Sequence, residues 1–222
     1  MRQASCVLLL LAALCTTQDS TGERQTGNGE TLVLPAPARK GKLSFEEVLA
    51  GRRSVRQFAD ARLTDPEVSQ LLWAAQGMTD AEGYRTAPSA GALYPLEVYV
   101  ATADGCFHYE PGRHLLHRNS KDDRRKAIYE AALSQDAVRE APAVFVIAAI
   151  YERTEGKYGE QRGARYVHME AGHAAQNLLL QAVAMGLGAV PIGAFQDSRI
   201  QEALRLPAEE QPLYLIPVGR PR

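Results

Sequence analysis

The chain has 222 residues, enough for one domain with a sizeable core and short appendages. Its formal net charge is -1, and the sequence contains no long basic or acidic run. These features argue against a general nucleic-acid or membrane-coating surface, so locally clustered arginines indicate a small anionic ligand.

Residues 1–17 have the layout of a secretory signal peptide, in which one basic residue precedes an apolar core from Val7 to Leu14. This core is too short to span a bilayer. Cys15 follows it as a lipobox cysteine would, but Leu14 stands where a small residue is expected. We expect an exported protein, periplasmic or extracellular, whose contact with a membrane would be limited to a lipid anchor on Cys15. A misassigned start codon is the alternative.

Residues 18–41 are polar and rich in Gly, Thr and Pro, which predicts a linker before a domain over residues 42–222. After signal cleavage Cys106 would be the only cysteine, so no intrachain disulfide is expected.

Helical and strand patterns alternate through the predicted domain. Two capping boxes, Ser44 with Glu47 and Thr64 with Glu67, each begin an amphipathic helix, and the second helix ends near Gly77. Further helices are predicted over 121–135, 164–188 and 199–206, and strands over 96–102, 142–150 and 213–219 and on both sides of a turn at 111–112. The order of elements predicts an α+β fold with a sheet covered by helices. The helix over 164–188 is apolar nearly all round, so we expect it inside the protein or in a subunit interface.

The segment GRRSVRQF, residues 51–58, places three arginines around one serine, and guanidinium and hydroxyl donors suit a phosphate monoester. The chain ends in GRPR, where Arg220 and Arg222 directly follow an apolar strand. The two basic segments could converge on one phosphate. The alternative is that the arginines bind the carbonyl groups of a helix end and solvent.

Two further segments would suit a flat ligand. The loop APSAGALYP, residues 87–95, consists largely of small residues that permit close approach to its backbone. The segment GLGAVPIGAF, residues 186–195, forms a compact turn that could direct a backbone N–H at a planar heterocycle. Each segment taken alone could equally be an ordinary loop.

In this order the motifs RRSVRQF, APSAGALYPLEVYV, EAGHAAQNLLLQAVAMGLGAVPIG and PVGRPR resemble the FMN-dependent nitroreductase superfamily, over residues 44–222. The wording of APSAGALYPLEVYV and KYGEQRGARYVHMEAGHAAQNL is similar to the SagB/ThcOx-type dehydrogenase branch, whose best-known members oxidise peptide azolines to azoles. The resemblance implies a nitroreductase-like α+β fold with a central, mostly antiparallel sheet covered by helices. It also implies a domain-entwined homodimer with FMN at the interface.

The resemblance implies a role for each matching residue. Arg52 and Ser54 would face the phosphate and ribityl chain of FMN, and Arg56 the N1/O2 edge of the ring, where a cation makes reduction easier. The loop at 88–93 would reach the FMN of the second subunit, and a backbone donor at 192–194 would meet flavin N5. The implied cofactor-binding residues are Arg52, Arg53, Ser54, Arg56, Pro88, Ser89, Ala90, Gly91, Leu93, Pro191, Ile192, Gly193, Ala194, Arg220 and Arg222.

Lys157 and Tyr158 match a Lys-Tyr pair that azoline oxidases use to remove a proton, so they are the candidate catalytic residues. The alternative is that Tyr158 shapes the pocket and Lys157 is an exposed loop lysine. His173 is expected to be a core histidine rather than a catalyst. No metal site is expected, because the five histidines do not cluster with other ligands.

Three functions follow from this interpretation. The first is a dehydrogenase that acts on a heterocycle or a peptide azoline, with ping-pong hydride transfer through flavin N5. The second is an NAD(P)H-dependent nitro or quinone reductase, which is hard to reconcile with export because nicotinamide cofactors are scarce outside the cytoplasm. The third is a non-catalytic flavin-binding protein.

Overall fold

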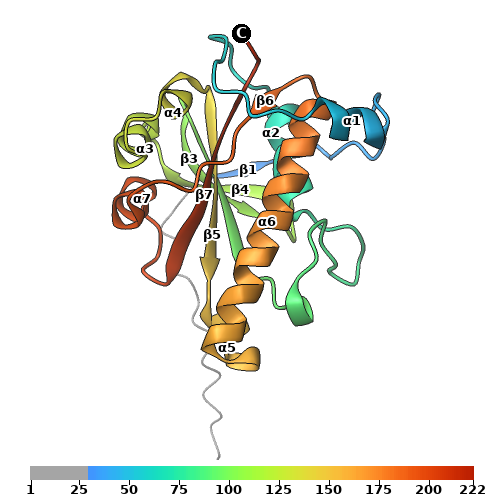
Figure 1. Ribbon diagram of the computed structural model, residues 1–222, viewed down its shortest axis with the longest axis vertical. Helices are drawn as coiled ribbons and strands as arrows, with labels where there is room; N and C mark the ends of the chain where they lie inside the picture. Colours follow the sequence, from blue (N-terminus) through green and yellow to red (C-terminus); the bar gives the residue numbers. More distant parts are fainter. Residues whose placement is uncertain (1–29) are drawn as a thin grey trace, which may run out of the picture.

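The computed structural model describes residues 30–222 (Figure 1). The predicted signal peptide over 1–17, its Cys15 and most of the predicted linker over 18–41 lie outside the described residues, so export and lipidation stay predictions.

The linker predicted over 18–41 contains a strand in the structure. Thr31–Val33 forms β1, which pairs with β4 (Leu115–Ser120) at the edge of the sheet. The domain therefore begins before residue 42. A strand of three residues followed by two prolines is too short to show a readable alternation of apolar and polar residues.

The described residues form one antiparallel sheet in the strand order β1-β4-β3-β2-β5-β7-β6. The remaining strands are β2 (Leu96–Thr102), β3 (Gly105–Glu110), β5 (Ala143–Ile150), β6 (Gly188–Ala189) and β7 (Glu210–Gly219). The strands predicted over 96–102, 142–150 and 213–219, and the pair around 111–112, are confirmed. The α+β fold with a central antiparallel sheet is confirmed with them.

Helices cover both faces of the sheet (Figure 1). One layer holds α1 (Phe45–Gly51), α2 (Asp65–Gln76), α5 (Glu152–Tyr158) and α6 (Glu160–Ala184). The other layer holds α3 (Arg125–Ala131), α4 (Asp136–Glu140) and α7 (Asp197–Leu204). The single helix predicted over 121–135 is wrong, because Leu133 and Ser134 adopt left-handed backbone angles, with φ of 56° and 55°, and break it between α3 and α4.

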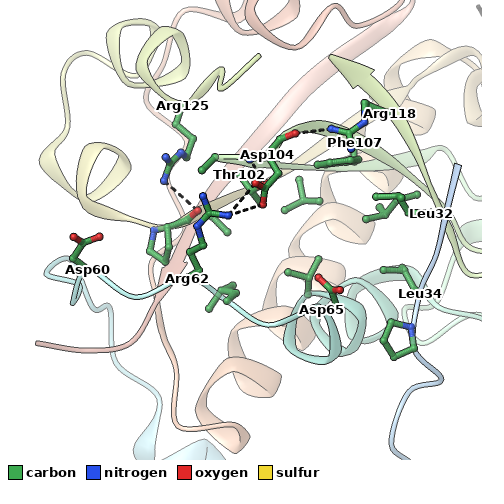
Figure 2. A pocket seen from close by; sticks show the side chains of 18 of the residues that line it. Leu32, Leu34, Asp60, Arg62, Asp65, Thr102, Asp104, Phe107, Arg118 and Arg125 are labelled. Atoms are coloured by element: carbon green, nitrogen blue, oxygen red, sulfur yellow. Dashed lines mark hydrogen bonds and ion pairs between the residues drawn. The ribbon is translucent and has the colours of Figure 1, made fainter. Parts of the chain in front are cut away.

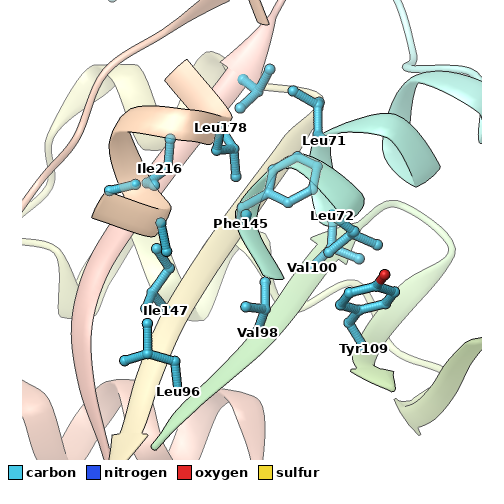
Figure 3. Packing of buried hydrophobic residues seen from close by; sticks show 14 of the residues in the cluster. Leu71, Leu72, Leu96, Val98, Val100, Tyr109, Phe145, Ile147, Leu178 and Ile216 are labelled. Carbon is cyan, nitrogen blue, oxygen red and sulfur yellow. The ribbon is translucent and has the colours of Figure 1, made fainter. Parts of the chain in front are cut away.

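The strand β5 shows how the sequence produces the two layers. Successive side chains of a strand point to opposite faces, so Phe145 and Ile147 pack toward α2 and α6 while Val144 and Val146 pack toward α3 and α7. Figure 3 shows Phe145 among the leucines of α2 and α6. Full burial of an aliphatic or aromatic side chain stabilises the fold by roughly 1.5–3 kcal/mol, so this doubly apolar strand anchors the sheet.

Both predicted capping boxes are present. The Glu47 carboxylate accepts the Ser44 backbone N–H at 2.7 Å, and the Glu67 carboxylate accepts the Thr64 backbone N–H at 2.8 Å. Gly77 ends α2 as predicted, because a Cβ there would lie 2.1 Å from the Trp73 ring.

The long helix α6 differs from its prediction. Its buried side chains lie on one face, whereas His168, Met169, His173 and Gln176 are exposed on the other. The description "apolar nearly all round" is therefore wrong, and His173 is not a core residue of this chain. Within residues 30–222, no helix combines the length and the hydropathy needed to cross a bilayer.

Candidate functional site

The basic segment after α1 runs in an extended conformation beside β6. The Val55 backbone N–H donates to the Ala189 carbonyl oxygen at 3.1 Å, and Ser54 forms a bridge with the same residue. Gly188 makes this approach possible, since a Cβ at that position would lie 2.6 Å from Val55. Phe58 is only 1% exposed and fixes the far end of the segment in the core.

The C-terminal basic residues lie against the same segment. The Ala59 backbone N–H donates to the Arg220 carbonyl oxygen at 2.9 Å, and the Arg222 backbone N–H donates to the Gln57 carbonyl oxygen at 3.2 Å. Phe58 also forms a bridge with the intervening Pro221. The two basic segments therefore lie side by side, although they come from opposite ends of the domain.

The arginines of the two segments differ in their partners. Arg52, Arg53 and Arg56 have no carboxylate within ion-pair distance in the described part of the chain, and Arg53 donates only to the carbonyl oxygens of Ala50 and Arg52. The Arg220 guanidinium binds the Glu67 carboxylate at 3.0 Å. Positive charge thus accumulates without compensation around Ser54, while Arg220 is already neutralised.

The predicted compact turn follows β6 directly. Ile192 exchanges two backbone hydrogen bonds with Leu215, at 2.8 and 3.0 Å, so its N–H is not available to a ligand. The N–H groups of Gly193 and Ala194 have no partner among residues 30–222, and both residues are exposed. The free donors of this turn are therefore Gly193 and Ala194.

The loop before β2 is backbone-strained. Gly91, Ala92 and Tyr94 have φ values of 65°, 55° and 46°, and left-handed conformations of non-glycine residues concentrate at functional sites. The Ser89 hydroxyl accepts the Tyr94 backbone N–H at 2.9 Å, and Arg153 donates to the Tyr94 carbonyl oxygen at 3.0 Å. These bonds hold the loop in its unusual shape.

Lys157 and Tyr158 lie against this loop. A Cβ on Gly91 would be 2.8 Å from the Tyr158 hydroxyl oxygen and 2.9 Å from Lys157 Nζ. Lys157 is exposed, and the half-buried Tyr158 ring packs edge-on against Tyr166 with centroids 5.0 Å apart. The structure thus brings together the candidate catalytic pair and the predicted ligand loop.

Behind the loop lies a buried acid that the sequence did not point to. Glu170 of α6 is 3% exposed, and one of its carboxylate oxygens has no hydrogen-bond partner among the described residues. Burial raises the pKa of this carboxyl group to about 7, against the opposing effects of Ser89, Arg85 and Gln76. The sequence did contain an indication of this buried acid, because Glu170 lies three residues after Val167 and therefore on the apolar face of α6.

The two groups of candidate residues lie at opposite ends of α6 (Figure 1). Gly51, next to the basic segment, faces Val183 near the C-terminal end, whereas Lys157 and Tyr158 directly precede the N-terminal end. At 1.5 Å per residue the ends are about 35 Å apart. A single chain therefore does not assemble all the predicted site residues in one place.

Gly91→Ala is expected to disturb the loop and the Lys-Tyr pair together. The left-handed backbone would cost about 1 kcal/mol or more with a side chain, and the added methyl group would displace Lys157 Nζ and the Tyr158 hydroxyl. Gly156→Ala is the matched control, because it lies in α5 and its Cβ would meet nothing within 4 Å. Thermal unfolding and turnover of both variants check this prediction, and equal behaviour of the two would contradict it.

Among residues 30–222 there is no group of three His, Cys, Asp or Glu side chains placed to hold a metal ion. Cys106 is buried, and burial raises the pKa of its thiol to about 12, which leaves it unreactive.

The sequence of residues 49–220 matches the Nitroreductase family. A protein from Methanocaldococcus jannaschii that is named as a nitroreductase is 46% identical over 198 residues, which cover 86% of this chain and 98% of that protein. A solved structure from Ralstonia eutropha JMP134, also named as a nitroreductase, matches with a TM-score of 0.80 and 30% identity over 86% of this chain and 90% of the other. With the antiparallel sheet between two helical layers, these matches define a nitroreductase-like fold. The chain belongs to the nitroreductase family, and it is an oxidoreductase.

A more distant similarity concerns a protein named for toxin processing. The trifolitoxin-processing protein TfxB of Rhizobium leguminosarum bv. trifolii is 29% identical over 134 residues, which cover 55% of this chain and 35% of that protein. The chain thus spans about a third of the length of this relative. The predicted superfamily is confirmed, whereas the SagB/ThcOx-type branch stays a prediction.

Proposed function

We propose that this chain is an FMN-dependent oxidoreductase that works as a homodimer with composite active sites. The observation that carries the proposal is the uncompensated positive charge of Arg52, Arg53 and Arg56, held beside a turn that offers two free backbone donors. An anionic ligand would neutralise the arginines, and a planar ring with acceptor atoms would use the donors.

The residues present fit FMN. Ser54, Arg52 and Arg56 supply donors of the kind that a phosphate monoester requires, whereas the Arg53 guanidinium donates to carbonyl oxygens at the end of α1. Gly193 has open space at its Cβ position and an exposed N–H, which suits close approach of a ring edge. When bound, FMN supplies the capacity to accept and return a hydride.

The chain's own residues then have separate tasks. Arg52 and Ser54 bind the phosphate, and Arg56 offers a cation to the ring. Gly193 and Ala194 donate backbone hydrogen bonds to the ring edge. Arg220 has a positioning task instead, because its ion pair with Glu67 ties the C-terminal segment to the start of α2.

The separation along α6 supports the homodimer. If two copies pack with their α6 helices antiparallel, the loop at 88–93 with Lys157 and Tyr158 of one copy would meet the basic segment of the other. Leu43, Phe45 and Leu49 around α1 are 45%, 63% and 46% exposed on the single chain, which fits a surface that a second copy covers.

For the substrate we propose a heterocycle or a peptide azoline, which the chain would dehydrogenate. Lys157 Nζ or the Tyr158 oxygen would take the proton from the carbon that loses hydride. The similarity to a protein named for toxin processing supports this substrate class. A nitro or quinone reductase is the second candidate, favoured by the name of the relative that is 46% identical.

The FMN assignment is tested with Arg52→Ala and Ser54→Ala. Each variant removes a phosphate contact, and a charge-assisted hydrogen bond contributes roughly 1.5–3 kcal/mol, so FMN affinity should fall by about tenfold to a hundredfold. Riboflavin, which has no phosphate, should bind nearly as before. Arg199→Ala is the control, since it removes an exposed arginine from α7 on the opposite face of the sheet.

Fluorescence titration of the flavin-free protein measures both affinities. Equal loss for FMN and riboflavin would place Arg52 and Ser54 away from the phosphate, and a protein that binds neither would contradict the proposal.

A further inference from the structure

A cavity of about 710 Å³ lies next to the residues that directly follow the basic segment (Figure 2). It is lined by residues 59–63, the start of α2, the strands β1 to β4, the end of α4 and the start of β5, whereas Ser54 of the basic segment pairs with β6 at the other edge of the sheet. Its floor is apolar and is made by Val100, Phe107 and Leu116 of three neighbouring strands. A cavity with an apolar floor inside a sheet and helix layer is the common setting of a small-molecule site.

The rim of this cavity is charged, but its arginines are already neutralised. Each of the four lining arginines forms an ion pair of its own. These pairs are Arg62–Asp104 at 2.9 Å, Arg118–Glu30 at 3.1 Å, Arg125–Asp123 at 2.6 Å and Arg139–Asp136 at 2.8 Å. An anion would have to displace these partners, so the arginines do not favour an anionic ligand.

Two lining carboxylates have no cation as partner. Asp65 and Glu140 form no hydrogen bond or ion pair with the residues that the structure describes, whereas the charge of Asp60 helps to raise the pKa of Arg125. The Glu140 Oε2 atom is also shielded from solvent and unpartnered. A carboxylate oxygen buried without a partner is costly, so a ligand that brings a positive charge would be stabilised there.

The floor suits the apolar part of a ligand rather than its charge. The Arg118 guanidinium already stacks on the Phe107 ring, 4.6 Å from its centroid, so the cation–π contact of this ring is taken. Figure 2 shows Asp65 and Leu34 on the side of the cavity that faces Phe107. Negative groups and apolar surface therefore face the same space.

We propose that this cavity binds an organic cation, an ammonium group joined to an apolar body. The ammonium group would lie toward Glu140 and Asp65, and the apolar body would cover Val100, Phe107 and Leu116. The proposal uses none of the residues assigned to FMN, so either proposed site can be disproved without affecting the other.

The test is isothermal titration of the full chain with three ligands of equal length, namely hexylammonium, hexanol and hexanoate. Hexylammonium should bind more tightly than hexanol, and hexanoate should bind least. Glu140→Gln and Asp65→Asn keep the side-chain shapes but remove charge, and each should weaken hexylammonium about tenfold or more. Glu209→Gln removes the same charge from an exposed position outside the cavity and should have no such effect.

Several results would overturn the proposal. The first is that hexylammonium does not bind to the full chain. The second is that hexanol or hexanoate binds at least as tightly as hexylammonium. The third is that Glu209→Gln weakens hexylammonium binding as much as Glu140→Gln or Asp65→Asn does. Circular dichroism of each variant confirms that any loss comes from the site and not from unfolding.

Discussion

Lys157→Ala combined with Tyr158→Phe is expected to slow oxidation of the substrate by about 10²- to 10⁴-fold, the range usual for a general base. Both side chains lie against Gly91 of the loop before β2. FMN content should stay unchanged, since neither residue lies in the basic segment or the turn at 191–194. Reduction of nitro or quinone acceptors should also survive, because solvent can supply those protons.

Anaerobic stopped-flow spectroscopy of the two half-reactions measures these effects separately. The matched control is Lys126→Ala with Tyr129→Phe, which removes the same side chains from α3 on the opposite face of the sheet. If substrate oxidation proceeds at the normal rate in the Lys157 and Tyr158 double variant, the pair is structural and the dehydrogenase proposal fails.

Glu170→Gln is expected to change the pH dependence of stability. Burial raises the pKa of Glu170 from 4.5 to about 7, so between these values the folded state binds the proton that the unfolded chain releases. Stability of the native protein therefore falls as the pH rises through this range. Above it the cost of burying the charged carboxylate reaches about 3 kcal/mol, whereas below pH 4.5 the cost is absent because both states are protonated.

Urea unfolding at about pH 5 and about pH 8, at fixed protein concentration, measures this effect as the difference between Glu170→Gln and the native protein. The variant is neutral at every pH, so its relative stability should rise by about 2.5 kcal/mol between the two conditions, because a small part of the cost is already present at pH 5. Glu202→Gln, an exposed position in α7, controls for general loss of charge. A difference that does not change with pH would show that the pKa of Glu170 is not raised in the folded protein.

Sequence patterns predicted the elements of this fold that are stabilised by interactions between residues close together in the chain. The capping boxes at Ser44 and Thr64 satisfy backbone donors within one helical turn, and the apolar run over 142–150 has to lie in a doubly covered strand. The edge strand β1 was missed because its stability depends on β4, which lies more than 80 residues away. The break between α3 and α4 depends on two left-handed residues that carry no glycine signal.

The sequence predicted the segments that form the candidate site, but it did not predict all of the contacts between them. The sequence indicated that the two basic segments converge, and the backbone pairing at Phe58 bears this out. It did not show that Glu67 neutralises Arg220 or that Leu215 takes the Ile192 N–H, because both contacts are long-range. Glu170 was missed because one acid on an apolar helix face is easily assigned to the surface.

Complementation between two defective chains tests the composite site most directly. One chain carries Arg52→Ala and Ser54→Ala, and the other carries Lys157→Ala and Tyr158→Phe. If the basic segment of one copy works with the Lys-Tyr pair of the other, each mixed dimer has one intact and one doubly defective site. With random exchange half of the dimers are mixed, so an equal mixture should recover about a quarter of native activity. A mixture no more active than its two components would show that the site does not form between two copies.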